Sequence, residues 1–247
     1  MGTYNRFAEI YDGLIAEDVD YALWRDFIIG KCSQYNIPMK DYLDLGCGTG
    51  NLSLIIGKLF SRCWCVDLSE DMLIIAEEKF RENRIKARFI MQNMIDLNLN
   101  TKFNLITSSL DCINYLTGDG DLDKLFSRIH AHLKDDGLFI FDINSEYKLK
   151  NILGENTFTY NSDEVVYIWE NRIESEIVEM ELTFFVKCDD FYERFDECHR
   201  ERIYSHSDIR TSLNNNGLMI IDTLDNYTDQ KPSYESERIT YIIGKAT

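Results

Sequence analysis

Three glycines at alternate positions follow a short apolar run near residue 45. The segment Tyr42-Leu-Asp-Leu-Gly-Cys-Gly-Thr-Gly50 places Asp44, Gly46, Gly48 and Gly50 where a first strand would end and a helix begin. Glycine lets the backbone turn sharply and approach a ligand without a Cβ atom in the way, and a helix N-terminus presents free N–H groups. A tight turn without a ligand is the alternative, but the alternating glycines favour a ligand-binding loop.

A second acidic residue stands at the end of the next apolar run. Asp67 directly follows Cys63-Trp-Cys-Val66. An acid at the tip of a second strand can accept hydrogen bonds from the ribose hydroxyls of a nucleoside laid across the sheet. Asp67 could instead be an acid in the first turn of a helix, but together with the glycine loop it predicts a nucleoside site.

The spacing of the glycines separates two kinds of nucleoside ligand. Gly46-x-Gly48-x-Gly50 differs from the G-x-G-x-x-G pattern that seats a pyrophosphate. The carboxylate of Asp44 would repel pyrophosphate, whereas it suits a ligand that carries a sulfonium and an ammonium group. These features favour S-adenosylmethionine over a nicotinamide dinucleotide, which is the competing interpretation.

An alternation of short apolar runs and longer amphipathic segments surrounds these residues, and it predicts a parallel sheet with helices on both faces. The expected strands are residues 42–45, 62–66, 87–91, 103–107 and 137–143. The expected helices are residues 4–35, 50–60, 70–83 and 121–134, the third with Ser69 as its N-cap.

The pattern changes after Asn144. Between Thr157 and Tyr204 apolar and polar residues alternate with period two, which is typical of antiparallel strands with one buried face. A helix over 207–216 and strands over 218–224 and 238–244 complete the chain. We therefore expect one α/β domain, residues 1–154 and 205–247, that carries an antiparallel β insertion at 155–204.

Composition limits the classes of partner. The net charge is −17, whereas proteins that grip phosphate backbones usually carry basic patches, so nucleic acid is not favoured. No apolar run approaches the length of a membrane span, and the N-terminus does not resemble a signal peptide. Seven cysteines without a CxxC pair indicate reduced thiols, a cytoplasmic location and no metal site.

Two of these motifs resemble those of a known family. Asp44-Leu-Gly-Cys-Gly-Thr-Gly50 is similar to motif I of class I S-adenosylmethionine-dependent methyltransferases, and Val66-Asp67-Leu-Ser is similar to their acidic second-strand motif. The likeness extends over the whole chain and is greatest to a subgroup with a Tyr-Asp-x-Leu signature, here Tyr11-Asp12-Gly13-Leu14. Small-molecule N-methyltransferases and many bacterial proteins of unassigned substrate have a similar layout.

The resemblance implies a Rossmann-like seven-stranded sheet and S-adenosylmethionine as the methyl donor. It implies that the glycine loop with Cys47 holds the methionine part and that Asp67 holds the ribose. Leu68, Asn93 and Met94 would flank the adenine; Asn93 stands where the family often has Asp, and its amide oxygen can accept the same hydrogen bond. Leu110 would complete this site, with Tyr11 and Tyr21 covering it.

The acceptor side is expected from three segments. Asp111 and Asn114 follow the fourth strand, nearest the transferable methyl group, although Asp111 could be only a helix cap. In the insertion, a Glu-x-His-x-x-Arg-x-Tyr run that the resembled subgroup shares is matched by Glu197, His199, Arg202 and Tyr204. We expect Asn114, Glu197, His199 and Arg202 to bind the acceptor, and His199, Asp111 and Tyr11 to be catalytic; a structural histidine paired with Glu197 is the alternative.

Three functions follow as hypotheses. The first is methylation of a nitrogen or oxygen on a small molecule. The second is methylation of tRNA or another RNA, and the third is a cofactor-binding module without catalysis.

Overall fold

The computed structural model describes residues 12–15 and 19–246. Its larger sheet has seven strands in the order β10-β11-β5-β4-β1-β2-β3. Neighbours pair in parallel from β5 through to β3, and β11 pairs antiparallel with both β5 and β10. The strands are β1 (Asp41–Leu45), β2 (Arg62–Asp67), β3 (Arg88–Met91), β4 (Phe103–Ser108), β5 (Leu133–Asn144), β10 (Leu218–Asp225) and β11 (Arg238–Lys245).

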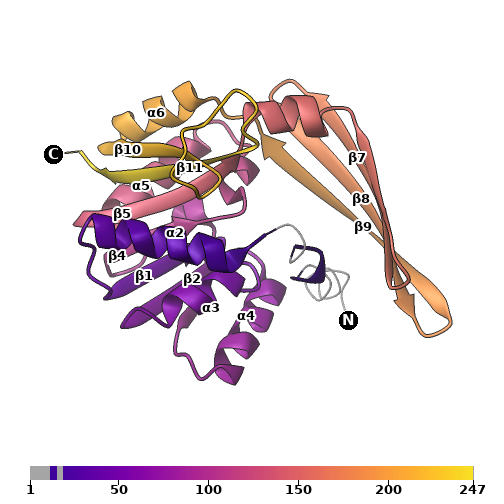
Figure 1. Cartoon of the computed structure of the whole chain (residues 1–247), viewed down its shortest axis with the longest axis horizontal. Coiled ribbons are helices and arrows are strands. Elements are labelled where there is room, and N and C mark those ends of the chain that lie inside the picture. Colours follow the sequence, from indigo (N-terminus) through magenta and orange to yellow (C-terminus); the bar gives the residue numbers. More distant parts are fainter. Residues whose placement is uncertain (1–11, 16–18, 247) are drawn as a thin grey trace.

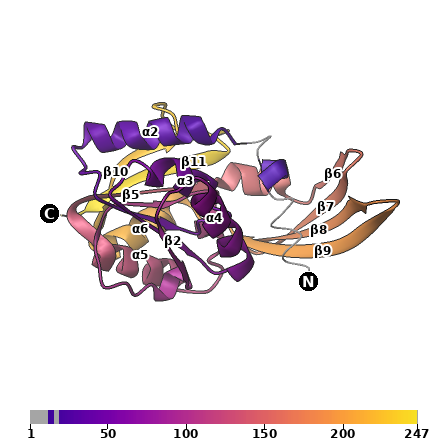
Figure 2. The same ribbon diagram turned by 90° about the horizontal axis from the view of Figure 1, so that it is seen from below.

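Helices cover both faces of this sheet, which confirms the expected fold class (Figure 1; Figure 2). They are α2 (Tyr21–Gln34), α3 (Asn51–Gly57), α4 (Glu70–Glu82), α5 (Asp121–His132) and α6 (His206–Asn215). Side chains alternate between two cores along each strand: Tyr42 packs with α2, α3 and α4, and its neighbour Leu43 packs with α5 and α6. Because both sets of alternating side chains are buried, such a strand appears in the sequence as a continuous apolar run.

The expected helix over residues 4–35 needs a correction. Within the described chain α2 begins only at Tyr21, because the Asp20 side chain accepts hydrogen bonds from the backbone N–H groups of Ala22 and Leu23 and caps the helix there. A separate helical turn lies at residues 12–15. Ser69 caps α4 as expected, accepting from the Met72 N–H.

The insertion forms a second sheet. After the π-helical turn η3 (Lys148–Leu153), an antiparallel meander contains β6 (Thr157–Asn161), β7 (Val165–Glu174), β8 (Ile177–Cys188) and β9 (Phe191–Arg202). It extends away from the larger sheet (Figure 1) and has its own small core, in which Leu149 and Leu153 pack on Val178 and Met180. No helix of the described residues is long and apolar enough to cross a membrane.

Candidate active site

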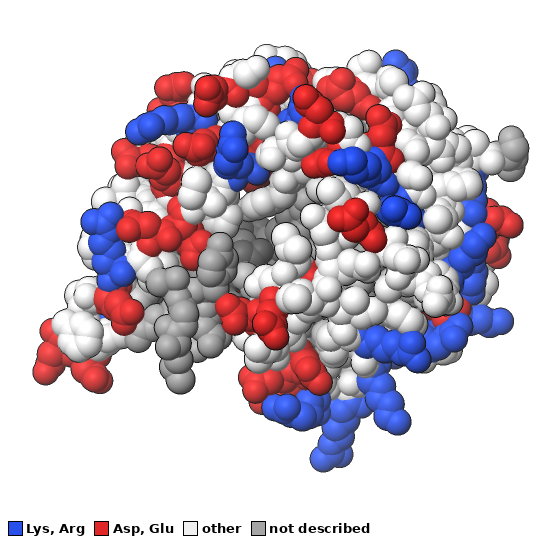
Figure 3. Space-filling model, turned by 180° about the vertical axis from the view of Figure 1, so that it is seen from behind, with Lys and Arg blue, Asp and Glu red and all other residues white. Residues whose placement is uncertain are grey.

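A cavity of about 1430 Å³ lies between the carboxyl ends of the central parallel strands and the inner face of the second sheet. Single-ligand sites usually enclose roughly 300–1,000 Å³, so this cavity has room for two molecules side by side. Lys148 and Arg238 are the cations among the described lining residues, and acids outnumber them. Seen from behind, the molecule is hollowed near its centre, and acidic and uncharged side chains border the hollow (Figure 3).

The glycine loop forms one end of the cavity. Gly46, Gly48 and Gly50 all have positive φ angles, +69°, +52° and +79°. A Cβ atom at Gly46 would lie 2.6 Å from the Sγ of Cys112, and one at Gly50 would lie 3.0 Å from the Cβ of Ala76. A Cβ at Gly48 would meet no atom within 4 Å, because this glycine faces the open cavity.

Gly50 therefore differs from the expectation that it contacts a ligand. It does not line the cavity; it precedes α3 and packs closely on α4. Gly46, Cys47 and Gly48 do line it.

Asp44 is a buried carboxyl group beneath this loop, 3% exposed. It accepts hydrogen bonds from Thr107 Oγ1 at 2.7 Å and from the Ser53 hydroxyl. Burial raises its pKa to about 7, and no ion pair to it is formed within the described chain. A buried acid without a cation, in the wall of a cavity, is the chemistry that a positively charged ligand would complement.

Asp67 fixes the shape of the loop. Its Oδ2 accepts from the Gly48 N–H at 2.8 Å and its Oδ1 from the Ser69 N–H at 2.9 Å. Each carboxylate oxygen keeps a further lone pair for a ligand. Leu68, Asn93 and Met94 line the same end, and the Asn93 side-chain oxygen already accepts from the Ile95 N–H at 3.2 Å.

The N-terminal segment is tied to this end by Asp12. Its carboxylate accepts from Thr49 Oγ1 at 2.5 Å and from Asn51 Nδ2 at 2.9 Å, and it forms an ion pair with Lys79. Tyr21 lines the cavity as expected, whereas Tyr11 lies outside the described residues. The sequence signature included Asp12, but its partners come from the glycine loop, α3 and α4 and could not be read from it.

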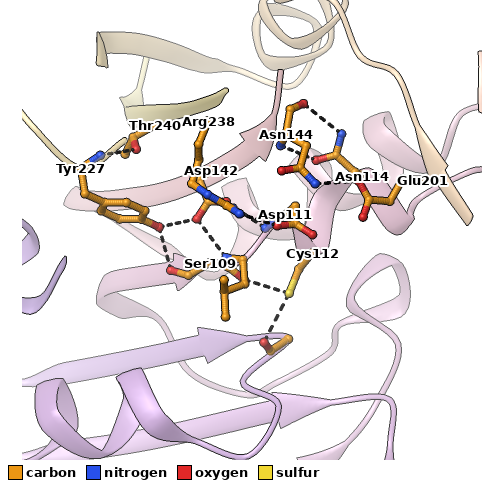
Figure 4. Close-up of polar contacts among 12 residues, drawn as sticks. Ser109, Asp111, Cys112, Asn114, Asp142, Asn144, Glu201, Tyr227, Arg238 and Thr240 are labelled. Carbon is orange, nitrogen blue, oxygen red and sulfur yellow. Dashed lines mark hydrogen bonds and ion pairs between the residues drawn. The ribbon is translucent and has the colours of Figure 1, made fainter. Parts of the chain in front are cut away.

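A buried ionic network holds the loop after β4 (Figure 4). Leu110 and Asp111 both have left-handed φ angles, +59° and +50°, and such residues cost of order 1–3 kcal/mol each. The fully buried carboxylate of Asp142 accepts both backbone N–H groups, at 2.9 and 2.8 Å. Arg238 pairs with Asp142 and, at 2.8 Å, with Asp111.

Tyr227 completes the network by donating its hydroxyl to Asp142 at 2.5 Å. Asp111 lines the cavity, but its carboxylate is neutralised by Arg238, and its side chain makes no capping hydrogen bond. This arrangement weakens the case for Asp111 as a free base. The roles of Asp142, Tyr227 and Arg238 were not predicted from the sequence.

Three expected acceptor-binding residues do not line the cavity. The buried Asn114 amide donates to the carbonyls of Asn144 and Arg202 and accepts from the Asn144 N–H at 3.0 Å. Arg202 pairs with Asp119 at 3.0 Å and with Glu176 at 3.3 Å. Glu197 lies on the inner face of the second sheet but outside the cavity wall. The Asn114 and Arg202 side chains thus join the insertion to the larger domain.

His199 and Glu201 line the cavity from β9. The His199 ring lies edge-on to Tyr115, with its Nδ1 at 3.4 Å from the tyrosine hydroxyl. Burial lowers the pKa of His199, which favours the neutral imidazole near pH 7. Glu201 was not predicted, although it lies two residues beyond His199 on the same strand face.

The fold and the site together define a class of protein. A Rossmann-like sheet places the glycine loop and Asp67 at the carboxyl ends of its strands, in the wall of a cavity that continues to the inner face of a second sheet. The family model described as "Methyltransferase domain" matches residues 43–137. A protein of Geobacillus sp. (strain WCH70) named "Putative methyltransferase" is 39% identical, over 98% of this chain and 100% of its own length.

Solved structures agree with these matches. An S-adenosylmethionine-dependent methyltransferase from Clostridium acetobutylicum is 49% identical, covers 100% of both chains and superposes with a TM-score of 0.94. The sugar N-methyltransferase KedS8 from Streptoalloteichus sp. shares the fold, with a TM-score of 0.79 at 16% identity over 96% of this chain and 93% of its own. The chain belongs to the S-adenosylmethionine-dependent methyltransferases.

Proposed function

We propose that this enzyme transfers the methyl group of S-adenosylmethionine to a nitrogen or oxygen atom of a small molecule. The observation that carries this proposal is the size and position of the cavity, which continues from the glycine loop to the inner face of the second sheet. A donor at one end leaves space for a small acceptor at the other.

The donor end fits the family's cofactor. Gly48 leaves space where a Cβ would stand, Asp44 offers a buried carboxyl group without a cation, and Asp67 has free acceptor lone pairs. When bound, S-adenosylmethionine supplies a methyl group activated by its sulfonium. Asp44, Gly46, Cys47 and Gly48 would hold its methionine part, and further contacts would come from Tyr21, Asp67, Leu68, Asn93, Met94 and Leu110.

The chain's own residues account for alignment and for exclusion of water. Asp142 and Arg238 hold Leu110 and Asp111 in place between the two halves of the cavity. The apolar inner face of the second sheet keeps water from the reacting atoms. His199, neutral near pH 7, would orient the acceptor, because an imidazole can both donate and accept a hydrogen bond.

The printed name of KedS8, a sugar N-methyltransferase, supports a small acceptor, and so does the net charge of −17. Methylation of RNA needs contact with a phosphate backbone, for which such a charge is unfavourable. A non-catalytic module would not need the second, acceptor-sized space.

Two measurements test this proposal. Calorimetry should show that S-adenosylmethionine binds, and incubation with pools of small amines and alcohols should release S-adenosylhomocysteine. Bulk tRNA, offered in parallel at moderate salt, should release none. Methylation of tRNA but of no small molecule would contradict the proposal, as would the absence of cofactor binding.

A further inference from the structure

The acceptor end of the cavity has an aromatic wall, which we define as Phe158, Tyr160, Tyr167, Trp169 and Phe184. All five side chains come from β6, β7 and β8 and line the cavity. The rings lie against one another, with centroids 5.5 Å apart for Phe158 and Trp169 and 5.6 Å apart for Tyr167 and Phe184. Such a surface favours an apolar or aromatic body, and its ring faces also attract cations.

A buried carboxyl group lies on the same face of the second sheet as this wall, further along the strands: Glu201 pairs with Val178 on β8, four residues from Leu182, which pairs with Trp169. Glu201 is 2% exposed and accepts a hydrogen bond from Asn144 Nδ2 at 2.9 Å. Burial, and then the negative charge of Asp111, raises the pKa of Glu201 well above its usual range. An acid in this environment takes up a proton readily, and a cation placed beside it restores its ionised form.

Asn144 gives a second, independent indication of a ligand. It lines the cavity and is 4% exposed, and its side-chain oxygen is buried with no hydrogen-bond partner among the described residues. Buried polar atoms are rarely left without a partner. Glu201 and Asn144 therefore offer two acceptor groups, and a ligand that carries several donors would satisfy both.

The charged residues that line the cavity further restrict the chemical class of the ligand. Arg238 is already paired with Asp111 and Asp142, so Lys148 is the remaining cation in the described part of the lining. Over the whole described lining of the cavity the acids outnumber the cations, which disfavours an anionic acceptor. An ammonium group has three donors, no acceptor and a positive charge, and it matches this end of the cavity.

We propose that the acceptor is an amine, with its nitrogen held by Glu201 and Asn144 and its apolar body over Met180, directed toward the aromatic wall. The inference rests on the proposed function. Glu201 binds the ammonium form as a carboxylate and then accepts one of its protons, so that the nitrogen regains its lone pair and the carboxyl group becomes neutral. Glu201 is thus both the specificity-determining residue and the proton acceptor.

The test uses the full chain saturated with S-adenosylhomocysteine and three ligands of similar size: 2-phenylethylamine, 2-phenylethanol and 3-phenylpropionate. Calorimetry should show that the amine binds at least about tenfold more tightly than the alcohol, because a hydrogen bond to a charged group is worth more than a neutral one. The carboxylate should bind most weakly. Equal binding of amine and alcohol, tighter binding of the carboxylate, or no binding of the amine would overturn the inference.

Two variants test whether Glu201 is responsible for the preference for an amine. Glu201→Gln should weaken amine binding about tenfold or more and leave alcohol binding unchanged. Glu181→Gln, on the exposed outer face of the neighbouring strand, should change neither. Unchanged amine affinity in Glu201→Gln would refute the assignment. If Glu201→Gln does not fold, the comparison of the three ligands on the unaltered protein still tests whether the acceptor is an amine. If S-adenosylmethionine itself does not bind, the proposed function is wrong.

Discussion

Arg238 should contribute more to stability than any surface ion pair of this protein. Its guanidinium joins two carboxylates, and the side chains of Arg238, Asp111 and Asp142 are 12%, 16% and 0% exposed. Burial alone would lower the pKa of Arg238, but Asp142 and Asp111 raise it, so the group stays charged. Arg238→Met leaves both carboxylates buried without a cation.

The expected cost follows from that geometry. Removal of one partner from a buried pair destabilises by about 3–5 kcal/mol. In a chain of this size each kcal/mol lowers the melting temperature by about 2–4 °C, so the fall should be about 6–20 °C. Unpaired buried carboxylates take up protons, so the deficit relative to the unaltered protein should shrink as the pH falls from about 8 to 5. Urea unfolding monitored at several pH values measures both effects.

The matched control is Arg81→Met, which removes an exposed pair with Glu78, where the side chains are 70% and 54% exposed. Such a pair is worth about 0–1 kcal/mol. The Leu110–Asp111 loop lines the cavity, so Arg238→Met should also weaken S-adenosylmethionine binding, whereas Arg81→Met should not. A loss of stability in Arg238→Met no larger than in the control would refute the reasoning.

The remaining predictions concern the donor end. The affinity for S-adenosylmethionine should rise as the pH increases through about 7. The reason is that the pKa of Asp44 is raised to about 7, and the cationic ligand needs the ionised carboxylate. Calorimetry from pH 6 to 8 should show this rise, and Asp44→Asn should abolish it. Since this folded-state pKa exceeds the ordinary 3.8, the protein without ligand should lose stability as the pH rises from about 4 to 7. Gly48→Ala should destabilise the protein by about 1–2 kcal/mol, because position 48 has a φ of +52°. Its Cβ would project into the open cavity, so S-adenosylmethionine should bind about tenfold or more weakly. Gly50→Ala should lower the melting temperature with a smaller loss of affinity, because its Cβ meets Ala76 and not the cavity. Asp12→Asn weakens the partly exposed ion pair with Lys79, so it should change the stability by less than about 1 kcal/mol. It should nevertheless lower the affinity for S-adenosylmethionine measurably in the same calorimetric assay.

Most of the fold could be predicted because its signals are local. Most strands of the larger sheet contain a short apolar run, and the second sheet alternates with period two. The same holds for the donor end, where the glycines and Asp67 act through the backbone at the ends of adjacent strands. The start of α2 was missed because apolar periodicity does not register a cap, and Asp20 supplies it.

The buried network was missed for a topological reason. Asp142 bonds to Tyr227 and Arg238, which lie 85 and 96 residues further along the chain. They meet only because β11 inserts between β10 and β5. Asn114 was misplaced for a similar reason, since its partners Asn144 and Arg202 come from two other strands. Glu201, in contrast, could have been predicted from the sequence. Side chains two residues apart on a strand point to the same face, so a strand that directs His199 toward the cavity also directs Glu201 there.

The two halves of the cavity depend on different packing. The donor end is made by loops of the larger sheet, held by local bonds such as those from Asp67 to Gly48 and Ser69. The aromatic wall stands on a separate sheet with its own core around Leu149 and Val178. Substitutions in the wall should therefore change which of the proposed acceptors fits without disturbing the proposed donor site. The exception is the loop at Leu110 and Asp111, which borders both halves, and there the protein uses a buried ionic network instead of exchangeable apolar contacts.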